Sequence, residues 1–210
     1  MKIESGKSAA ENDTNISSKS SSEKPVRADA KRNLDAILVA AKDVFATSGV
    51  DAPVREIAQK AGFGVGTLYR HFPNRAELIA AVFRREVDAC ADTAASYLET
   101  HPPFEALALW MQRYAGFIAT KRGLASALHS GDPAFSALPG HFDKRLRPAL
   151  QMLLDAAIAA GEARQDIEAD DLLNAIARLC MATNEKKPKQ GEEMVALLTD
   201  GLRHKAGEKN

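Results

Sequence analysis

The amino-acid sequence predicts an all-α protein, and three observations support this prediction. Hydrophobic residues make up 45% of the 210 residues and charged residues 27%, which is enough apolar material for a buried core. Aromatic residues make up only 6%, whereas the helix-forming residues Ala, Leu, Arg and Glu are frequent. The strict alternation of apolar and polar residues that is typical of strands is rare.

The hydropathy pattern argues against secretion and membrane insertion. The N-terminus has no apolar segment of the signal-peptide kind, and apolar runs such as residues 156–160 are far shorter than the roughly 20 residues that span a bilayer. We therefore expect a cytoplasmic protein with no membrane partner. The two cysteines, Cys90 and Cys180, lack metal-like or CxxC spacing, which favours reduced core thiols over a redox switch.

The order of elements follows from apolar periodicity and from Gly and Pro breaks. Residues 1–26 are rich in Ser, Lys, Glu and Asn and predict a disordered tail. Apolar residues then recur at helical spacing from near Ala28, with breaks at Gly49, Gly62 and Pro73. The pattern predicts helices over residues 28–48, 54–61, 65–72, 75–98, 104–120, 123–129, 142–160, 169–181 and 192–203.

The two short helices at residues 54–61 and 65–72 have the pattern of a helix-turn-helix. Small Ala58 suits the point where the helices approach most closely, and Gly62 suits a turn that needs a positive φ. In a helix-turn-helix the first helix braces the second in the major groove of DNA. The expected buried seam between the helices is Ile57, Ala61, Phe63 and Leu68.

A longer string of residues resembles the signature of the TetR family of transcriptional regulators. The string is Ile57-Ala58, Ala61-Gly62, Gly66-Thr67-Leu68-Tyr69-Arg70-His71-Phe72 and Glu77-Leu78. The resemblance implies a DNA-binding domain over residues 27–90, with its helix-turn-helix at about 53–72, and a helical domain over 91–210 that binds an effector and dimerises. It also implies a homodimer on a palindromic operator, most often acting as a repressor.

The resemblance makes residues 65–72 the recognition helix. Gly66 allows close approach to the duplex, and Thr67, Tyr69 and His71 can reach phosphate oxygens. Arg70 suits a phosphate or a guanine edge, and Val65 a thymine methyl. By similarity, Arg55 and Arg75 contact the flanking backbone of the DNA.

Three positions depart from the family pattern. Gly64 replaces a common Ser or Thr cap, Pro53 replaces a frequent Thr, and Arg75 replaces the usual Lys. The basic residues Arg27, Lys31 and Arg32 before the first helix suit either a contact with the DNA backbone or minor groove, or a solvated helix start.

The C-terminal half contains no catalytic constellation, so we expect neither an enzyme nor a cofactor. His129, Asp132 and His141 are too loosely spaced for a metal site, and we predict none. An aromatic stripe suggests an effector pocket, with plain core packing as the alternative. The pocket candidates are Trp110, Met111, Tyr114, Phe117, Leu128, His129, Phe135 and Met152.

The last two long helices are the predicted dimer interface, and closing the core of the monomer is the alternative. The interface candidates are Leu172, Leu173, Ile176, Leu179, Leu197 and Leu198, with Cys180, Met194 and Leu202 beside them. Two other functions stay open. A helical scaffold protein that has lost DNA binding would fit Gly64 and a formal net charge of zero, and a ligand-independent regulator would fit the same fold.

Overall fold

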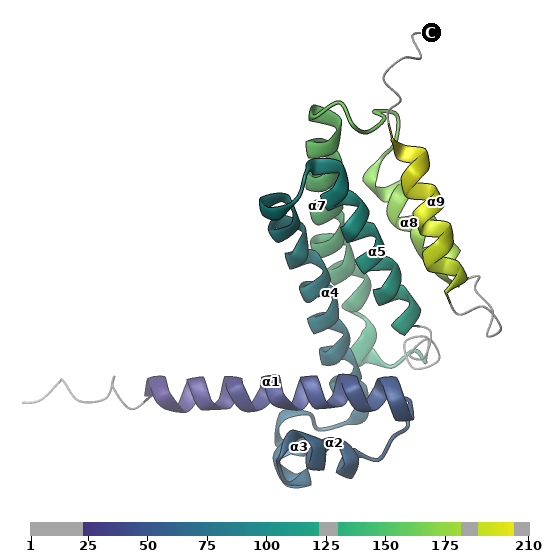
Figure 1. Ribbon diagram of the computed structural model, residues 1–210. Coiled ribbons are helices and arrows are strands. Elements are labelled where there is room, and N and C mark those ends of the chain that lie inside the picture. Colours follow the sequence, from purple (N-terminus) through teal and green to yellow (C-terminus); the bar gives the residue numbers. More distant parts are fainter. Residues whose placement is uncertain (1–22, 122–129, 182–188, 204–210) are drawn as a thin grey trace, which may run out of the picture. The chain divides into compact units, whose positions relative to one another are not determined.

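The computed structural model describes residues 23–121, 130–181 and 189–203, and the side chains of residues 23–28 and 119–121 are outside that description. Within these ranges the elements are helical, apart from one isolated bridge between Ala163 and Arg203 (Figure 1). The chain divides into two units, residues 1–35 and 36–210. The first unit contributes the start of α1, and all the other described elements lie in the second.

The N-terminal helices follow the sequence prediction closely. Helix α1 spans Glu23–Ser48, beginning before the expected start near Ala28, and is followed by α2 at Val54–Ala61 and α3 at Val65–His71. Helix α4 spans Arg75–Thr100 without interruption. The predicted domain boundary between residues 90 and 91 therefore falls inside a continuous helix.

The C-terminal helices are α5 at Pro103–Lys121, α7 at Leu138–Ala159, α8 at Ala169–Met181 and α9 at Gln190–Leu202. Helix α8 matches its predicted range, whereas α7 begins four residues before the predicted residue 142. A 3₁₀ turn, η2 at Pro133–Phe135, was not predicted. The expected helix at 123–129 lies outside the described residues.

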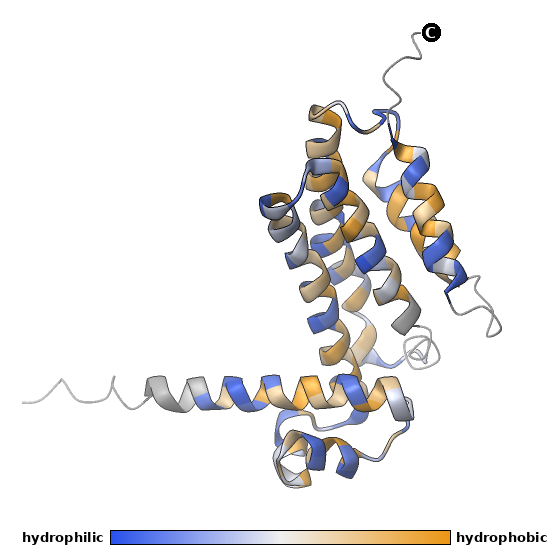
Figure 2. Ribbon diagram, in the orientation of Figure 1, coloured by the Kyte–Doolittle hydropathy of each residue, from blue (hydrophilic) through white to orange (hydrophobic). Residues whose placement is uncertain are grey.

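The core of the C-terminal part lies among α4, α5 and α7, with α8 and α9 packed against α5 (Figure 1). Figure 2 shows apolar and hydrophilic segments alternating along these helices, as expected where one face of each helix is buried. The largest fully buried side chains there include Phe83, Leu107, Trp110, Leu150 and Leu153. None of the described helices is both long enough and apolar enough to cross a membrane.

A smaller core holds together the N-terminal three-helix head, which comprises residues 36–72 of α1, α2 and α3. The side chains of Ile57 and Leu68 are at most 1% exposed, which confirms the predicted seam at these two positions, and Ala58, expected where the two helices approach most closely, is 2% exposed. Ala61 and Phe63 are half-buried, so they lie at the edge of the seam. The head also buries Ile37, Ala41 and Val44 of α1.

Candidate nucleic-acid interface

The turn between α2 and α3 is set by Gly62. Its φ of +78° is a left-handed conformation that glycine adopts without steric penalty. The amide of Gly62 donates to the Gln59 carbonyl at 3.1 Å, and that of Phe63 donates to the Ala58 carbonyl at 2.9 Å. These bonds satisfy the last carbonyls of α2 and send the chain directly into α3.

The start of α3 has no side-chain cap. Gly64 occupies the N-cap position with extended backbone, and only its carbonyl takes part, accepting from the Thr67 amide at 2.9 Å. The missing hydroxyl noted in the sequence therefore leaves the first turn of α3 without the side-chain hydrogen bond that a Ser or Thr would supply.

Helix α3 presents one buried face and one open face. Leu68 is 1% exposed, whereas Tyr69 is 47% exposed and Gly66 and Arg70 are also exposed. A Cβ placed on Gly66 would meet no heavy atom within 4 Å. The predicted contacts Val65, Thr67 and His71 are half-buried, and the His71 ring lies beside that of Phe72.

The cations of the head fall into two groups. Lys42 pairs with Glu86 at 2.7 Å and Lys60 pairs with Asp43 at 3.0 Å, so α1 is tied to both α4 and α2 by ion pairs. Arg55 and Arg70, by contrast, have no ion pair or hydrogen bond with any described side chain and are exposed. The uncompensated positive charge of α2 and α3 therefore includes the two arginines that sequence reasoning assigned to DNA.

Arg75 differs from the other predicted DNA contacts. Its guanidinium is half-buried and donates a hydrogen bond to the carbonyl of Val50, in the turn between α1 and α2. Next to it, the Asn74 side chain accepts from the Glu77 amide at 2.8 Å and donates to the Glu77 carboxylate at 2.9 Å. This reciprocal cap fixes the first turn of α4.

The basic residues before the head lie in the first unit. Lys31 and Arg32 are exposed, and Arg32 pairs with the carboxylate of Asp29. The side chain of Arg27 lies outside the described part of the chain.

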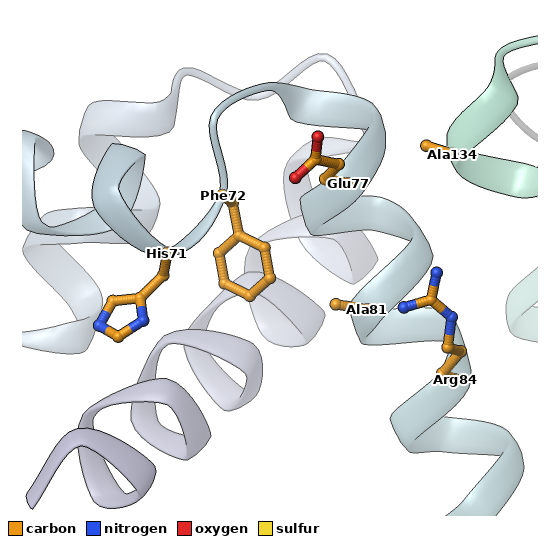
Figure 3. A pocket seen from close by; sticks show the side chains of 6 residues that line it. All are labelled: His71, Phe72, Glu77, Ala81, Arg84 and Ala134. Atoms are coloured by element: carbon orange, nitrogen blue, oxygen red, sulfur yellow. The ribbon is translucent and has the colours of Figure 1, made fainter. Parts of the chain in front are cut away.

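Two hollows lie beside the head. One, of about 310 Å³, is bounded by Glu77, Ala81 and Arg84 along α4, by His71 and Phe72 on one side, and by Ala134 (Figure 3). The other, of about 390 Å³, has Val50, Ile79 and Phe135 among its lining residues. Phe135 is the one predicted effector-pocket residue that lines either of these two hollows.

The other described pocket candidates pack as core, except Met152. Trp110 and Met111 are fully buried, and Tyr114 and Phe117 are at most 7% exposed. The Trp110 Nε1–H donates to the Cys90 carbonyl at 2.9 Å, and its ring stacks on Tyr114 with centroids 5.6 Å apart. Met152 is 40% exposed on α7. Leu128 and His129 lie outside the described residues.

Burial alters the chemistry of two groups in this core. It raises the pKa of the Cys90 thiol to about 12, and it raises the pKa of the Tyr114 hydroxyl well above its usual range. Both groups are therefore neutral at physiological pH, and the thiolate that would make Cys90 reactive is suppressed.

The predicted dimer residues divide between core and surface. Leu172 and Ile176 of α8 are buried, so they contribute to the core of the monomer, which was the alternative interpretation. Leu173, Leu179 and Leu198 are partly buried against that core. Leu197 of α9 is 62% exposed, and Met181 at the end of α8 is 46% exposed.

A polar cluster between α4 and α7 was missed by sequence reasoning. Arg145 donates from Nε to Asp88 at 2.7 Å and from a terminal nitrogen to Asp92 at 2.5 Å. His141 Nε2 lies 3.1 Å from the same Asp88 oxygen without forming a hydrogen bond in the described structure. The sequence signal for this cluster was a spacing of four residues on each helix, between Asp88 and Asp92 on α4 and between His141 and Arg145 on α7.

No group of three or more His, Cys, Asp and Glu residues that could hold a metal ion occurs in ranges 23–121, 130–181 and 189–203.

Comparison with known proteins identifies the family. The profile of bacterial regulatory proteins of the tetR family matches residues 37–82, and that of the SbtR-like transcriptional regulator C-terminal domain matches residues 102–204. A TetR transcriptional regulator from Streptomyces coelicolor is 39% identical, with a TM-score of 0.71, over 82% of this chain and 99% of that one. The chain belongs to the TetR family. It is therefore a DNA-binding transcriptional regulator and not an enzyme.

Two further relatives extend the comparison. An HTH-type transcriptional regulator of Staphylococcus aureus (strain USA300) is 39% identical over 64 residues, which are 30% of this chain and 35% of the relative's length. The transcriptional regulator FadR of Bacillus subtilis, whose structure contains stearoyl-CoA, shares the fold at 19% identity and a TM-score of 0.58. That match covers 79% of this chain and 95% of FadR.

Proposed function

We propose that this TetR-family protein is a cytoplasmic homodimer that represses transcription by placing two α3 helices in successive major grooves of a palindromic operator. The observation that carries the proposal is the open face of α3, where Gly66, Tyr69 and Arg70 are exposed. Arg55 at the start of α2 adds a second cation without a partner in the described structure. Cations without a protein partner and an exposed helix surface allow contacts with the phosphates of DNA.

Within this proposal each side chain of α3 has a role. Thr67, Tyr69 and His71 contact phosphate oxygens and fix the register of the helix on the duplex. Arg70 contacts a phosphate or a guanine edge, and Val65 a thymine methyl, which would contribute sequence preference. Arg55 and Arg75 contact the backbone on either side.

The dimer would form through α8 and α9. Leu197, 62% exposed, and Met181, 46% exposed, are large apolar side chains on these helices that the monomer leaves uncovered. A second copy of the same surface, related by a two-fold axis, would bury both. Leu173, Leu179 and Leu198, which are partly buried, would lie at its edge.

Binding of a small apolar or amphipathic effector in the C-terminal domain would change the distance between the two DNA-binding heads of the dimer and so release the operator. The stearoyl-CoA in FadR supports this at the level of the fold.

A ligand-independent regulator is the second candidate. It is favoured by the close packing of Trp110, Met111, Tyr114 and Phe117 in the core.

The test of DNA binding is the double variant Tyr69→Phe with His71→Ala. If these residues are phosphate contacts, the variant binds all duplexes more weakly, by about tenfold or more, with a shallower dependence on salt. Tyr97→Phe with His101→Ala is the matched control, since that pair of the same residue types lies near the far end of α4. Equal affinity of both double variants, each shown to be folded, would contradict the proposal.

A further inference from the structure

The structure assigns Arg75 a second task, which depends on the proposed function: it positions the start of α2 through the Val50 carbonyl while keeping a full charge for the DNA. Among the predicted DNA contacts, Arg75 is the one for which the described structure shows a long-range side-chain hydrogen bond, to a carbonyl 25 residues earlier in the chain. A residue that served only as a phosphate contact would need no such partner.

The acceptor, the Val50 carbonyl, lies in the turn that leads into α2. Val50 is 9% exposed and belongs to the main core, as does Ile79 of α4. Its neighbours form a tight turn, in which the Ala52 amide donates to the Gly49 carbonyl at 3.2 Å and Gly49 has a φ of +78°. Pro53, the N-cap of α2, follows directly. Holding the Val50 carbonyl therefore fixes the point from which α2 starts.

The donor side is equally well fixed. Arg75 is the first residue of α4, and the reciprocal hydrogen bonds of Asn74 and Glu77 hold that turn. Arg75 forms no ion pair with any described carboxylate. Because its partner is a neutral carbonyl, the positive charge stays uncompensated and available to a phosphate.

A guanidinium can do both tasks at once. It carries five N–H donors on a rigid planar fork, so one edge can hold a carbonyl while another faces a phosphate. The ammonium of a lysine is a compact point charge on a flexible stem. Replacing Arg75 with lysine would therefore keep the charge and lose the brace.

The experiment compares Arg75→Lys with Arg147→Lys. Arg147 is the control, because it is an exposed arginine of α7, its side chain is 60% exposed, and it has no role in the proposed DNA contacts. Two quantities are measured: affinity for the tightest duplex selected from a random DNA pool, at several salt concentrations, and amide hydrogen exchange of the free protein at residues 49–52.

We expect Arg75→Lys to weaken binding about tenfold while leaving the salt dependence unchanged, because the number of cations is the same. Amide exchange at residues 49–52 should rise at least fivefold in the free protein. Arg147→Lys should stay within about threefold of the parent in affinity, with unchanged exchange at the turn. Arg75→Gln should combine the faster exchange with a shallower salt dependence, in which the slope of log affinity against log salt concentration falls by about one in magnitude.

Parental affinity and parental exchange in Arg75→Lys would overturn the inference and leave Arg75 a plain phosphate contact. Tenfold weaker binding with unchanged exchange at residues 49–52 would also overturn it, because the loss would then arise at the DNA alone. If the parent protein selects no duplex, the proposed operator binding fails. The exchange measurement on the free protein still decides whether the brace exists.

Discussion

Gly66 is a residue whose proposed role lies with the DNA and not with the fold. It lies on the exposed face of α3 with open space around its Cα, so nothing in the described protein requires glycine there. Glycine within a helix costs roughly 0.5–1 kcal/mol relative to alanine. Under the proposed function, glycine at this position allows close approach of the DNA backbone.

We therefore expect Gly66→Ala to stabilise the protein by about 0.5 kcal/mol and to weaken DNA binding by tenfold or more, because the added methyl would meet the duplex. Urea unfolding and a DNA titration measure the two effects. Gly140→Ala is the control, since Gly140 is also an exposed helical glycine with open space around it, on α7. Weakened DNA binding in Gly140→Ala as well would remove the argument.

Trp110 can distinguish a closely packed core from an effector pocket. Its side chain is fully buried, stacks on Tyr114 and donates to the Cys90 carbonyl. Trp110→Ala should lower the free energy of unfolding by about 3–5 kcal/mol, the range for a buried aromatic residue truncated to alanine. A loss below about 1 kcal/mol in urea unfolding would mean that the tryptophan lines a space that a ligand can fill.

Single residues were predicted from sequence where one local pattern determines them. Gly62 had to adopt a positive φ because two short helices met there, and Leu68 had to be buried because it completed their apolar seam. Arg75 was predicted as a cation for DNA, a role still to be measured. Its Val50 acceptor could not be inferred, because a carbonyl leaves no signature in the side-chain pattern.

Among whole elements, α2 and α8 were predicted with their observed bounds, and the differences have a physical cause. The predicted start at residue 142 was four residues late, since α7 begins at Leu138 and carries Pro139 and Gly140 in its first turn. Proline is tolerated in the first turn of a helix, where its missing N–H would have no partner in any case. The short η2 turn escaped prediction because three residues carry no periodicity.

The ion-pair cluster that joins α4 to α7 should contribute to the stability of the protein. Arg145 binds both Asp88 and Asp92, and these hydrogen bonds raise its pKa, so it stays charged. Arg145→Met should lower stability by about 0.5–1 kcal/mol at low salt and by less at high salt, because its side chain is partly exposed and screened.

Arg147→Met is the comparison for this prediction. Arg147 lies on the same helix but pairs with one carboxylate, that of Asp170, and its side chain is 60% exposed. Its loss should therefore cost less than that of Arg145. Thermal unfolding of both variants at two salt concentrations measures the difference, and equal costs would show that the double pairing adds no stability.

At the scale of the whole molecule, the buried Cys90 and Tyr114 predict loss of stability in alkali. Burial raises the pKa of Cys90 from 9.0 to about 12 and raises that of Tyr114 above 10.0. The folded state therefore holds these protons more tightly than the unfolded state. Their contribution is complete below pH 9 and is lost as the pH rises from about 9 towards 12.

The measurement is the midpoint of thermal unfolding between pH 7 and pH 11. The midpoint should fall above pH 9 in the parent protein, and it should fall less steeply in the double variant Cys90→Ala with Tyr114→Phe, whatever its stability at pH 7. The same slope in both proteins would mean that other groups cause the alkaline loss. Cys90 should likewise resist thiol reagents until the protein unfolds.

Sequence-specific binding of the assembled dimer to DNA can be measured by selecting bound duplexes from a random DNA pool at two salt concentrations. We predict enrichment of a palindrome whose half-sites lie about one helical turn apart, with binding that weakens steeply as salt rises. No enriched sequence at either salt concentration, from protein shown to be folded, would rule out this function and favour a helical scaffold that has lost DNA binding.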